Sequence, residues 1–156
     1  MNLWQLPLPA KPKNRTVYLL ACMLVFMVSY SHASAYRVET LAEGLEFPWS
    51  LAFLPDGQLL VSERTGSLQL IDSQGEKRKV VGVPNVFAAG QAGLKHVALA
   101  PDFAQSQFIY LTYSCGTQRA NSLCLARARL AGQALQDLSL LFTAQPMRRG
   151  AAHYGG

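Results

Sequence analysis

The sequence has 156 residues, half of them hydrophobic, and a formal net charge of +5 at pH 7. The positive excess lies at the start, where Lys11, Lys13 and Arg15 occur, whereas residues 36–156 carry 11 Lys and Arg against 9 Asp and Glu. This nearly balanced charge excludes the strongly basic surface of a nucleic-acid-binding protein, and the length allows one domain.

Residues 1–35 have the organisation of a secretory signal peptide. The three basic residues form its n-region, the apolar stretch TVYLLACMLVFMVSY follows, and Ala33-Ser34-Ala35 provides small residues for cleavage. We therefore expect residues 1–35 to be removed on export and residues 36–156 to reach the periplasm.

Two other interpretations of this segment are less favoured. A transmembrane anchor needs roughly 20 apolar residues, and the apolar run here has about 15. The letters LLAC resemble a lipoprotein box with Cys22 as the acylated residue, but only six residues separate Arg15 from Cys22. That distance is too short for a normal apolar region.

From Tyr36 onward, short apolar runs alternate with turn residues. The runs SLAFL, QLLVSE and LQLID are separated by PDG and RTGS and are followed by SQGE. Runs of about five residues bounded by Gly, Pro, Asp and Ser are typical of an all-β protein. The later stretch AGQALQDLSLLF is expected to form a turn and a last strand, because Gly132 and the neighbouring strands disfavour a helix.

An internal repeat indicates the architecture. The segment LAFLPD at residues 51–56 returns 46 residues later as VALAPD at residues 97–102, and each copy leads into an apolar strand. A β-rich repeat of roughly 40–50 residues is typical of one β-propeller blade, whose two apolar faces must stack on neighbouring blades. The sequence therefore predicts an all-β, partial β-propeller of about two to three blades.

Two cysteines lie on the arms of a predicted hairpin. The segment CGTQRANSLC places Cys115 and Cys124 on either side of turn residues, between the apolar stretches FIYLTY and LCLARARL. In an oxidising compartment a disulfide here would contribute about 2–3 kcal/mol in the chain-entropy model. Two free buried thiols are the alternative. Zinc is disfavoured, because no second Cys or His pair accompanies them.

Three ordered stretches resemble the soluble aldose sugar dehydrogenases, the glucose/sorbosone dehydrogenase family that depends on pyrroloquinoline quinone (PQQ). They are GLEFPWSLAFLPDGQLLVSERTGSLQLID, VPNVFAAGQAGLKHVALAPDFAQSQFIYLTYS and the terminal AHYGG. The resemblance covers roughly residues 38–156. It implies that residues 36–156 are the N-terminal portion of a six-bladed propeller. That propeller binds PQQ and calcium at the mouth of its channel and oxidises the C1 hydroxyl of aldoses.

The same resemblance assigns roles to two residues. His153 corresponds to the general base that takes the hydroxyl proton as hydride moves to the quinone, a role that suits a neutral imidazole. Gln91, in the loop AGQAG, corresponds to a glutamine that contacts substrate or cofactor, with glycines that let the backbone approach a ligand. No residue is assigned as a metal ligand. Phe47 and Trp49 are expected to pack in the propeller core.

Some positions depart from the family pattern. Lys95 and His96 follow GQAGL where relatives commonly have an acidic or small residue, and Ala152 stands where Asn or Asp often precedes the histidine. These positions adjoin the substrate site, so the sugar preference stays open.

The resemblance reaches only the first part of the family pattern. Residues 36–156 correspond to about 2.6 repeats, and the family's calcium ligands and quinone-binding basic residues fall later. We therefore expect a truncated chain that is inactive alone and associates through exposed blade faces. One alternative is a non-catalytic exported module for binding or assembly. A calcium-dependent lactonase is disfavoured, because the acidic residues are few and lie mostly in turns.

Overall fold

The computed structural model describes residues 36–152. The predicted signal peptide at residues 1–35 and the predicted base His153 lie outside these described residues. From Glu39 onward the chain forms one compact unit. Within the described range, no helix has the length and apolar character that crossing a bilayer requires.

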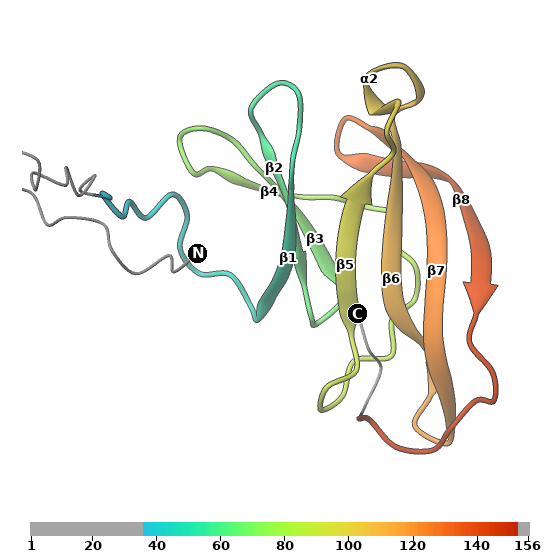
Figure 1. Cartoon of the computed structure of the whole chain (residues 1–156). Coiled ribbons are helices and arrows are strands. Elements are labelled where there is room, and N and C mark those ends of the chain that lie inside the picture. Colours follow the sequence, from blue (N-terminus) through green and yellow to red (C-terminus); the bar gives the residue numbers. More distant parts are fainter. Residues whose placement is uncertain (1–35, 153–156) are drawn as a thin grey trace, which may run out of the picture. The chain divides into compact units, whose positions relative to one another are not determined.

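The described strands form two antiparallel sheets of four, each ordered as in the chain (Figure 1). The first sheet contains β1 (Pro48–Phe53), β2 (Leu59–Glu63), β3 (Ser67–Ile71) and β4 (Lys77–Lys79). The second contains β5 (Leu94–Leu99), β6 (Phe108–Thr117), β7 (Ala120–Ala131) and β8 (Ala134–Thr143). A four-stranded meander of this kind is the unit of a propeller blade. The all-β prediction is confirmed, including the turn and last strand formed by AGQALQDLSLLF.

The sequence repeat has a structural counterpart. Its two copies begin in β1 and β5, the first strand of each sheet. After the first copy, the Leu54 amide donates to the Gln58 carbonyl at 2.8 Å; after the second, the Ala100 amide donates to the Phe108 carbonyl at 2.9 Å. The second loop is four residues longer, and its extra length forms the short helix α2 (Phe103–Ser106), which the sequence analysis did not predict.

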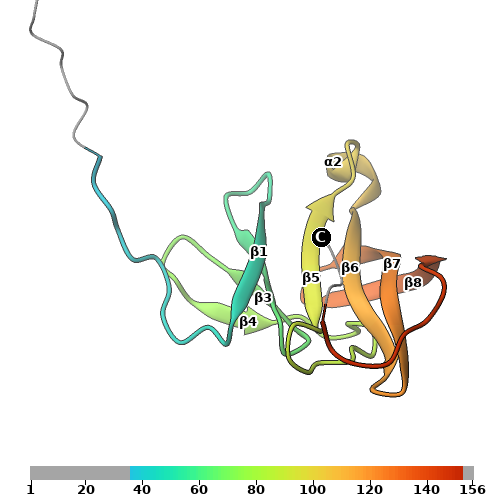
Figure 2. The same ribbon diagram turned by 60° about the horizontal axis from the view of Figure 1, so that its bottom comes forward.

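The two sheets share one hydrophobic core. Strand β5 packs against β1 and β2, so the sheets lie side by side at their first strands (Figures 1 and 2). Beyond β4 the chain crosses to the second sheet, where Val81 donates to the Gln133 carbonyl and accepts from the Leu135 amide. The buried side chains of this core come from both sheets: Leu54, Leu60, Leu68, Leu70, Val80, Leu94, Val97, Phe103, Ile109, Leu111, Tyr113, Cys124, Ala126, Ala128, Leu130 and Leu135.

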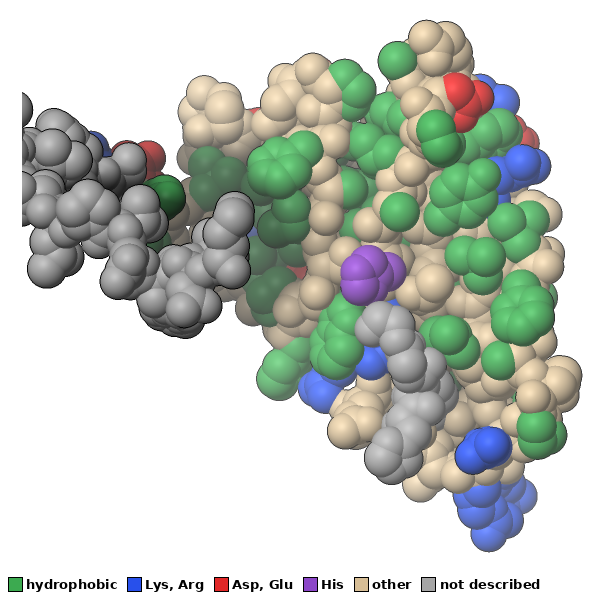
Figure 3. Space-filling view, in the orientation of Figure 1, with side chains coloured by type: hydrophobic (Ala, Val, Ile, Leu, Met, Phe, Trp, Pro, Cys, Tyr) green, Lys and Arg blue, Asp and Glu red, His purple; other side chains and the backbone are tan. Residues whose placement is uncertain are grey.

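The outer faces of the two sheets remain apolar and open among the described residues. Leu51 and Phe53 are 51% and 73% exposed, whereas Val97, at the position equivalent to Leu51 in the repeat, is 3% exposed. The first sheet covers this face of the second sheet, but the described residues leave the corresponding face of the first sheet largely uncovered. On the far side of the second sheet, Phe142 is 58% exposed. Space-filling shows several such apolar side chains at the surface (Figure 3).

Candidate functional site

Gln91 lies in the connection that leads from β4 into β5. Buried Ser114 on β6 fixes this loop with two hydrogen bonds: its amide donates to the Gly93 carbonyl at 2.9 Å, and the Gly93 amide donates to its Oγ at 3.1 Å. The Phe87 amide donates to the Ser114 carbonyl at 2.8 Å. The segment of residues 80–93, called the Gln91 loop below, is therefore tied to β6 on both sides of Gln91.

Gly93 is required by a close approach of two backbone segments. A Cβ atom at this position would overlap the carbonyl of Arg64, which also accepts the amide hydrogen of Leu94 at 3.1 Å. The family resemblance predicts that the glycines of AGQAG let the backbone approach a ligand. In the structure, the close neighbour of Gly93 is the protein's own backbone.

The segment leading to His153 lies beside the Gln91 loop. The Gln91 amide donates to the Ala151 carbonyl at 2.9 Å, and a Cβ atom added at Gly90 would lie 3.0 Å from the same carbonyl oxygen. The connection before β5 and the segment after β8 thus meet at one end of the sheets. His153 itself lies outside the described residues, and its role as the base stays a prediction. Ala151, which accepts the hydrogen bond from Gln91, precedes His153 by two residues in the sequence.

Arg64 also contributes to this end of the fold, although the sequence pattern does not predict a role for it. Its guanidinium lies 4.4 Å from the centre of the Phe47 ring, and its Nη1 donates to the Gly90 carbonyl. Arg64 opens the RTGS turn after β2, a place where a charged residue is ordinarily solvent-exposed. Nothing in the local pattern distinguishes it, because its contacts arise only when β1 pairs with β2 and the Gln91 loop approaches the turn after β2.

Lys95 occupies a buried position on the first strand of the second sheet. It is 4% exposed, and its Nζ lies 3.6 Å from the centre of the Trp49 ring. Burial, followed by the nearby charge of Arg64, lowers the pKa of the Lys95 ammonium. Trp49 and Lys95 are equivalent in the 46-residue repeat, and each lies where the pairing of its strand is irregular.

The expectation that Phe47 and Trp49 pack in the core is wrong. Phe47 is 63% exposed and Trp49 is 43% exposed. Each ring instead makes a cation–π contact: the Phe47 ring with Arg64 and the Trp49 ring with Lys95. His96, the other departure from the family pattern, is exposed, and its amide donates to Thr112 Oγ1 at 3.1 Å.

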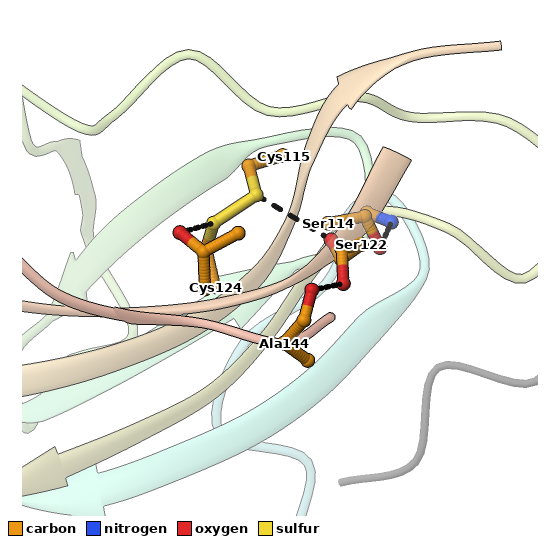
Figure 4. Close-up of a disulfide and its surroundings, with 7 residues drawn as sticks. Ser114, Cys115, Ser122, Cys124 and Ala144 are labelled. Carbon is orange, nitrogen blue, oxygen red and sulfur yellow. Dashed lines mark hydrogen bonds between the residues drawn. A yellow bond between two sulfur atoms is a disulfide. The ribbon is translucent and has the colours of Figure 1, made fainter. Parts of the chain in front are cut away.

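Cys115 and Cys124 form a disulfide between β6 and β7, with their Cα atoms 5.8 Å apart (Figure 4). The predicted pairing is confirmed, and the alternative of two free thiols is wrong for this structure. Cys115 directly follows Ser114, the anchor of the Gln91 loop. Close by, Ser122 Oγ donates to the Ala144 carbonyl at 2.5 Å, which holds the segment after β8 against β7.

The glucose / sorbosone dehydrogenase family model matches residues 45–156. The chain belongs to this family. The aldose sugar dehydrogenase YliI of Escherichia coli K12 is 33% identical over 148 residues, which cover 92% of this chain and 40% of that protein. The predicted family resemblance is thereby confirmed.

Solved structures of the family share the fold. A crystal structure of glucose dehydrogenase, 38% identical, matches with a TM-score of 0.73 over 78% of this chain and 37% of its own. The PQQ-bound aldose sugar dehydrogenase of Streptomyces coelicolor, 30% identical, matches with a TM-score of 0.60 over 72% of this chain and 37% of its own. With the two blade-like sheets, these matches confirm the partial propeller fold. The chain spans about two fifths or less of the length of these relatives.

Proposed function

We propose that this chain supplies the part of a sugar dehydrogenase site that contains Gln91 and His153. In the proposed reaction an aldose loses the proton of its C1 hydroxyl to His153 while hydride leaves C1 for a quinone. Gln91 contacts the substrate or the cofactor. The observation that carries the proposal is the 2.9 Å hydrogen bond from the Gln91 amide to the Ala151 carbonyl. It aligns the Gln91 loop with the segment that continues into His153.

The residues near Gln91 are compatible with PQQ. The quinone supplies the hydride acceptor when bound, and the protein supplies position and the base. Its carboxylates can accept hydrogen bonds from a side-chain amide such as that of Gln91. Among residues 36–152, no group of three or more His, Cys, Asp and Glu side chains is placed to hold a metal ion. The proposal therefore assigns no calcium ligand to this range.

The proposed role of His153 sets a geometric requirement. A general base must lie within hydrogen-bond reach of the proton it removes. The anchored Gln91 loop fixes the backbone at Ala151, which precedes His153 by two residues in the sequence. A neutral imidazole can accept this proton.

We further propose that the chain is exported to the periplasm after cleavage following Ala35. The basic n-region, the apolar run and the Ala-Ser-Ala site support this proposal. N-terminal sequencing of protein recovered from an expressing bacterium should begin at Tyr36. A protein that begins at Met1 would refute cleavage, and an acylated Cys22 would establish the lipoprotein alternative.

The chain alone is proposed not to turn over sugars and to associate through its outer faces. The uncovered apolar side chains of Leu51, Phe53 and Phe142 support association. Its span of two fifths or less of its relatives supports inactivity. Dye reduction with glucose, PQQ and calcium should therefore show no rate above that of His153→Ala. Turnover above that control would refute this part of the proposal.

A chimera tests the site itself. Residues 36–156 would replace the matching segment of the Escherichia coli aldose sugar dehydrogenase, and circular dichroism would establish that each chimera folds. We expect the chimera to oxidise glucose with PQQ, His153→Ala to remove turnover, and Gln91→Ala to reduce kcat/KM. Exposed Gln74, in the turn between β3 and β4, is changed to Ala as the matched control and should leave turnover unchanged. A folded chimera that stays fully active with His153→Ala would contradict the proposed base.

A further inference from the structure

A cationic rim lies at the end of the second sheet, where β6 turns into β7. It consists of Arg119, in the β6–β7 turn, and of Arg148 and Arg149, in the segment after β8. All three side chains are exposed. Space-filling shows blue basic side chains gathered at this end of the molecule (Figure 3). The rim is therefore built from two chain segments that are distant in sequence.

The backbone that carries these arginines is fixed to the hairpin. The Asn121 amide donates to the Arg148 carbonyl at 2.9 Å, and the Arg148 amide donates back to the Asn121 carbonyl at 2.8 Å. Asn121 Nδ2 donates to the Gly150 carbonyl at 2.7 Å, and the Gly150 amide donates to the Gln118 carbonyl at 3.2 Å. These bonds fix the backbone that carries the rim before any ligand arrives, so binding has to order only the arginine side chains.

The rim surrounds two adjoining hollows. One, of about 490 Å³, is lined by Arg148 and Arg149 together with polar groups such as Ser122. The other, of about 670 Å³, is lined by Arg119 and Arg149. Arg149 borders both hollows. Both hollows are open to solvent, so a small anion can reach the arginines.

The positive charge of the rim is not balanced by carboxylates within the described residues. From residue 103 to residue 152 the sequence contains five arginines and one acidic residue, Asp137. Asp137 pairs with Arg129, 3.5 Å away, and Arg129 also donates to the Ser106 carbonyl in α2. No ion pair within residues 36–152 joins the rim to a carboxylate. Arginine forks match the geometry of carboxylate and phosphate oxyanions.

We propose that the cationic rim binds the oxyanion of a small molecule, a phosphate or a carboxylate, beside the Gln91 loop. The Gln91–Ala151 hydrogen bond places the rim's segment next to that loop. A sugar that carries an anionic group would thus be preferred over a neutral aldose. The sugar preference rests on the proposed function, whereas oxyanion binding does not.

Titration of the isotopically labelled chain with inorganic phosphate, followed by NMR, tests the rim directly. We expect saturable shifts confined to residues 117–122 and 148–151. The triple variant Arg119→Gln, Arg148→Gln, Arg149→Gln should weaken phosphate binding at least tenfold. The matched control removes the same charge from exposed β4, by Lys77→Gln, Arg78→Gln and Lys79→Gln, and should change the affinity less than twofold. Absence of saturable shifts, or equal weakening by both triple variants, would overturn the proposal.

Competition then identifies the source of the oxyanion. Displacement of phosphate by glucose 6-phosphate or gluconate, but not by glucose, assigns the rim to anionic sugars. Displacement by PQQ alone assigns it to the carboxylates of the quinone, which supports the oxyanion site and refutes the sugar preference. If neither the anionic sugars nor PQQ displaces phosphate, the rim does not serve a small organic anion and the proposal fails. An inactive chimera would count against the proposed dehydrogenase function without altering the phosphate titration.

Discussion

The ammonium of Lys95 lies 3.6 Å from the centre of the Trp49 ring, and the two residues occupy the same position in successive repeats. One repeat thus uses an aromatic ring where the next uses a buried cation, and the two side chains meet across the sheet–sheet contact. Stacking on the ring compensates part of the cost of burying the charge. Burial still dominates, since the pKa of Lys95 is lowered.

The lowered pKa of Lys95 predicts a stability that rises with pH. Between its pKa in the folded state and its usual value of 10.5, the unfolded chain binds a proton that the folded chain lacks. The free energy of unfolding therefore increases as pH rises through this window. Lys95→Met lacks the titrating group and so does not gain this stability. As the pH rises toward 10.5, the free energy of unfolding of Lys95→Met should therefore fall relative to that of the wild type. Urea unfolding at several pH values measures the difference, with Lys79→Met on exposed β4 as the baseline. The prediction would be contradicted if the stability of Lys95→Met relative to wild type varied with pH in the same way as that of Lys79→Met.

Gly93→Ala should destabilise the protein by about 2 kcal/mol or more, because the new methyl group overlaps the Arg64 carbonyl. Gly132→Ala is the matched control. Gly132 has φ +60° and no neighbour within 4 Å of an added Cβ, so its substitution carries only the cost of left-handed backbone, about 1 kcal/mol. Urea unfolding compares the two variants. If both variants lost the same free energy of unfolding, the contact between residue 93 and the Arg64 carbonyl would be able to relax.

Arg64→Ala should loosen the Gln91 loop. Removal of the guanidinium eliminates the hydrogen bond to the Gly90 carbonyl and the stacking on Phe47, together worth about 1–2 kcal/mol. Hydrogen exchange should accelerate at the Gln91 and Leu94 amides. Arg64→Lys retains the charge but not the planar fork, so it should restore less than half of the protection.

The control for Arg64 is Arg78→Ala. Arg78 Nη2 donates to Gln58 Oε1 at 2.6 Å on the exposed surface of the first sheet. This variant should leave exchange in the Gln91 loop unchanged. If Arg64→Lys restored full protection, charge rather than geometry would account for the role of Arg64.

The regular parts of the fold follow from local signals, and the contacts near Gln91 do not. The LAFLPD repeat and the turn residues predict β1, β5 and their neighbours, because period and turn chemistry are local. Helix α2 was missed because its four residues follow the same Pro-Asp pair that forms a plain turn in the first copy. The stacking of Arg64 on Phe47 depends on the pairing of β1 with β2, and the stacking of Lys95 on Trp49 depends on the packing of β5 against β1. The role of His153 remains a prediction based on family resemblance.

The disulfide should stabilise the end of the second sheet that anchors the Gln91 loop. Cys115 and Cys124 are nine positions apart, and opening so short a loop should cost about 2–3 kcal/mol in the chain-entropy model. Urea unfolding with and without reductant measures this loss. The double variant Cys115→Ser, Cys124→Ser should unfold like the reduced wild type and should not respond to reductant. Because Ser114 precedes Cys115 and bonds to Gly93, hydrogen exchange at the Gly93 amide should also accelerate on reduction. Alkylation of both cysteines in the exported, unreduced protein would show that the disulfide does not form there.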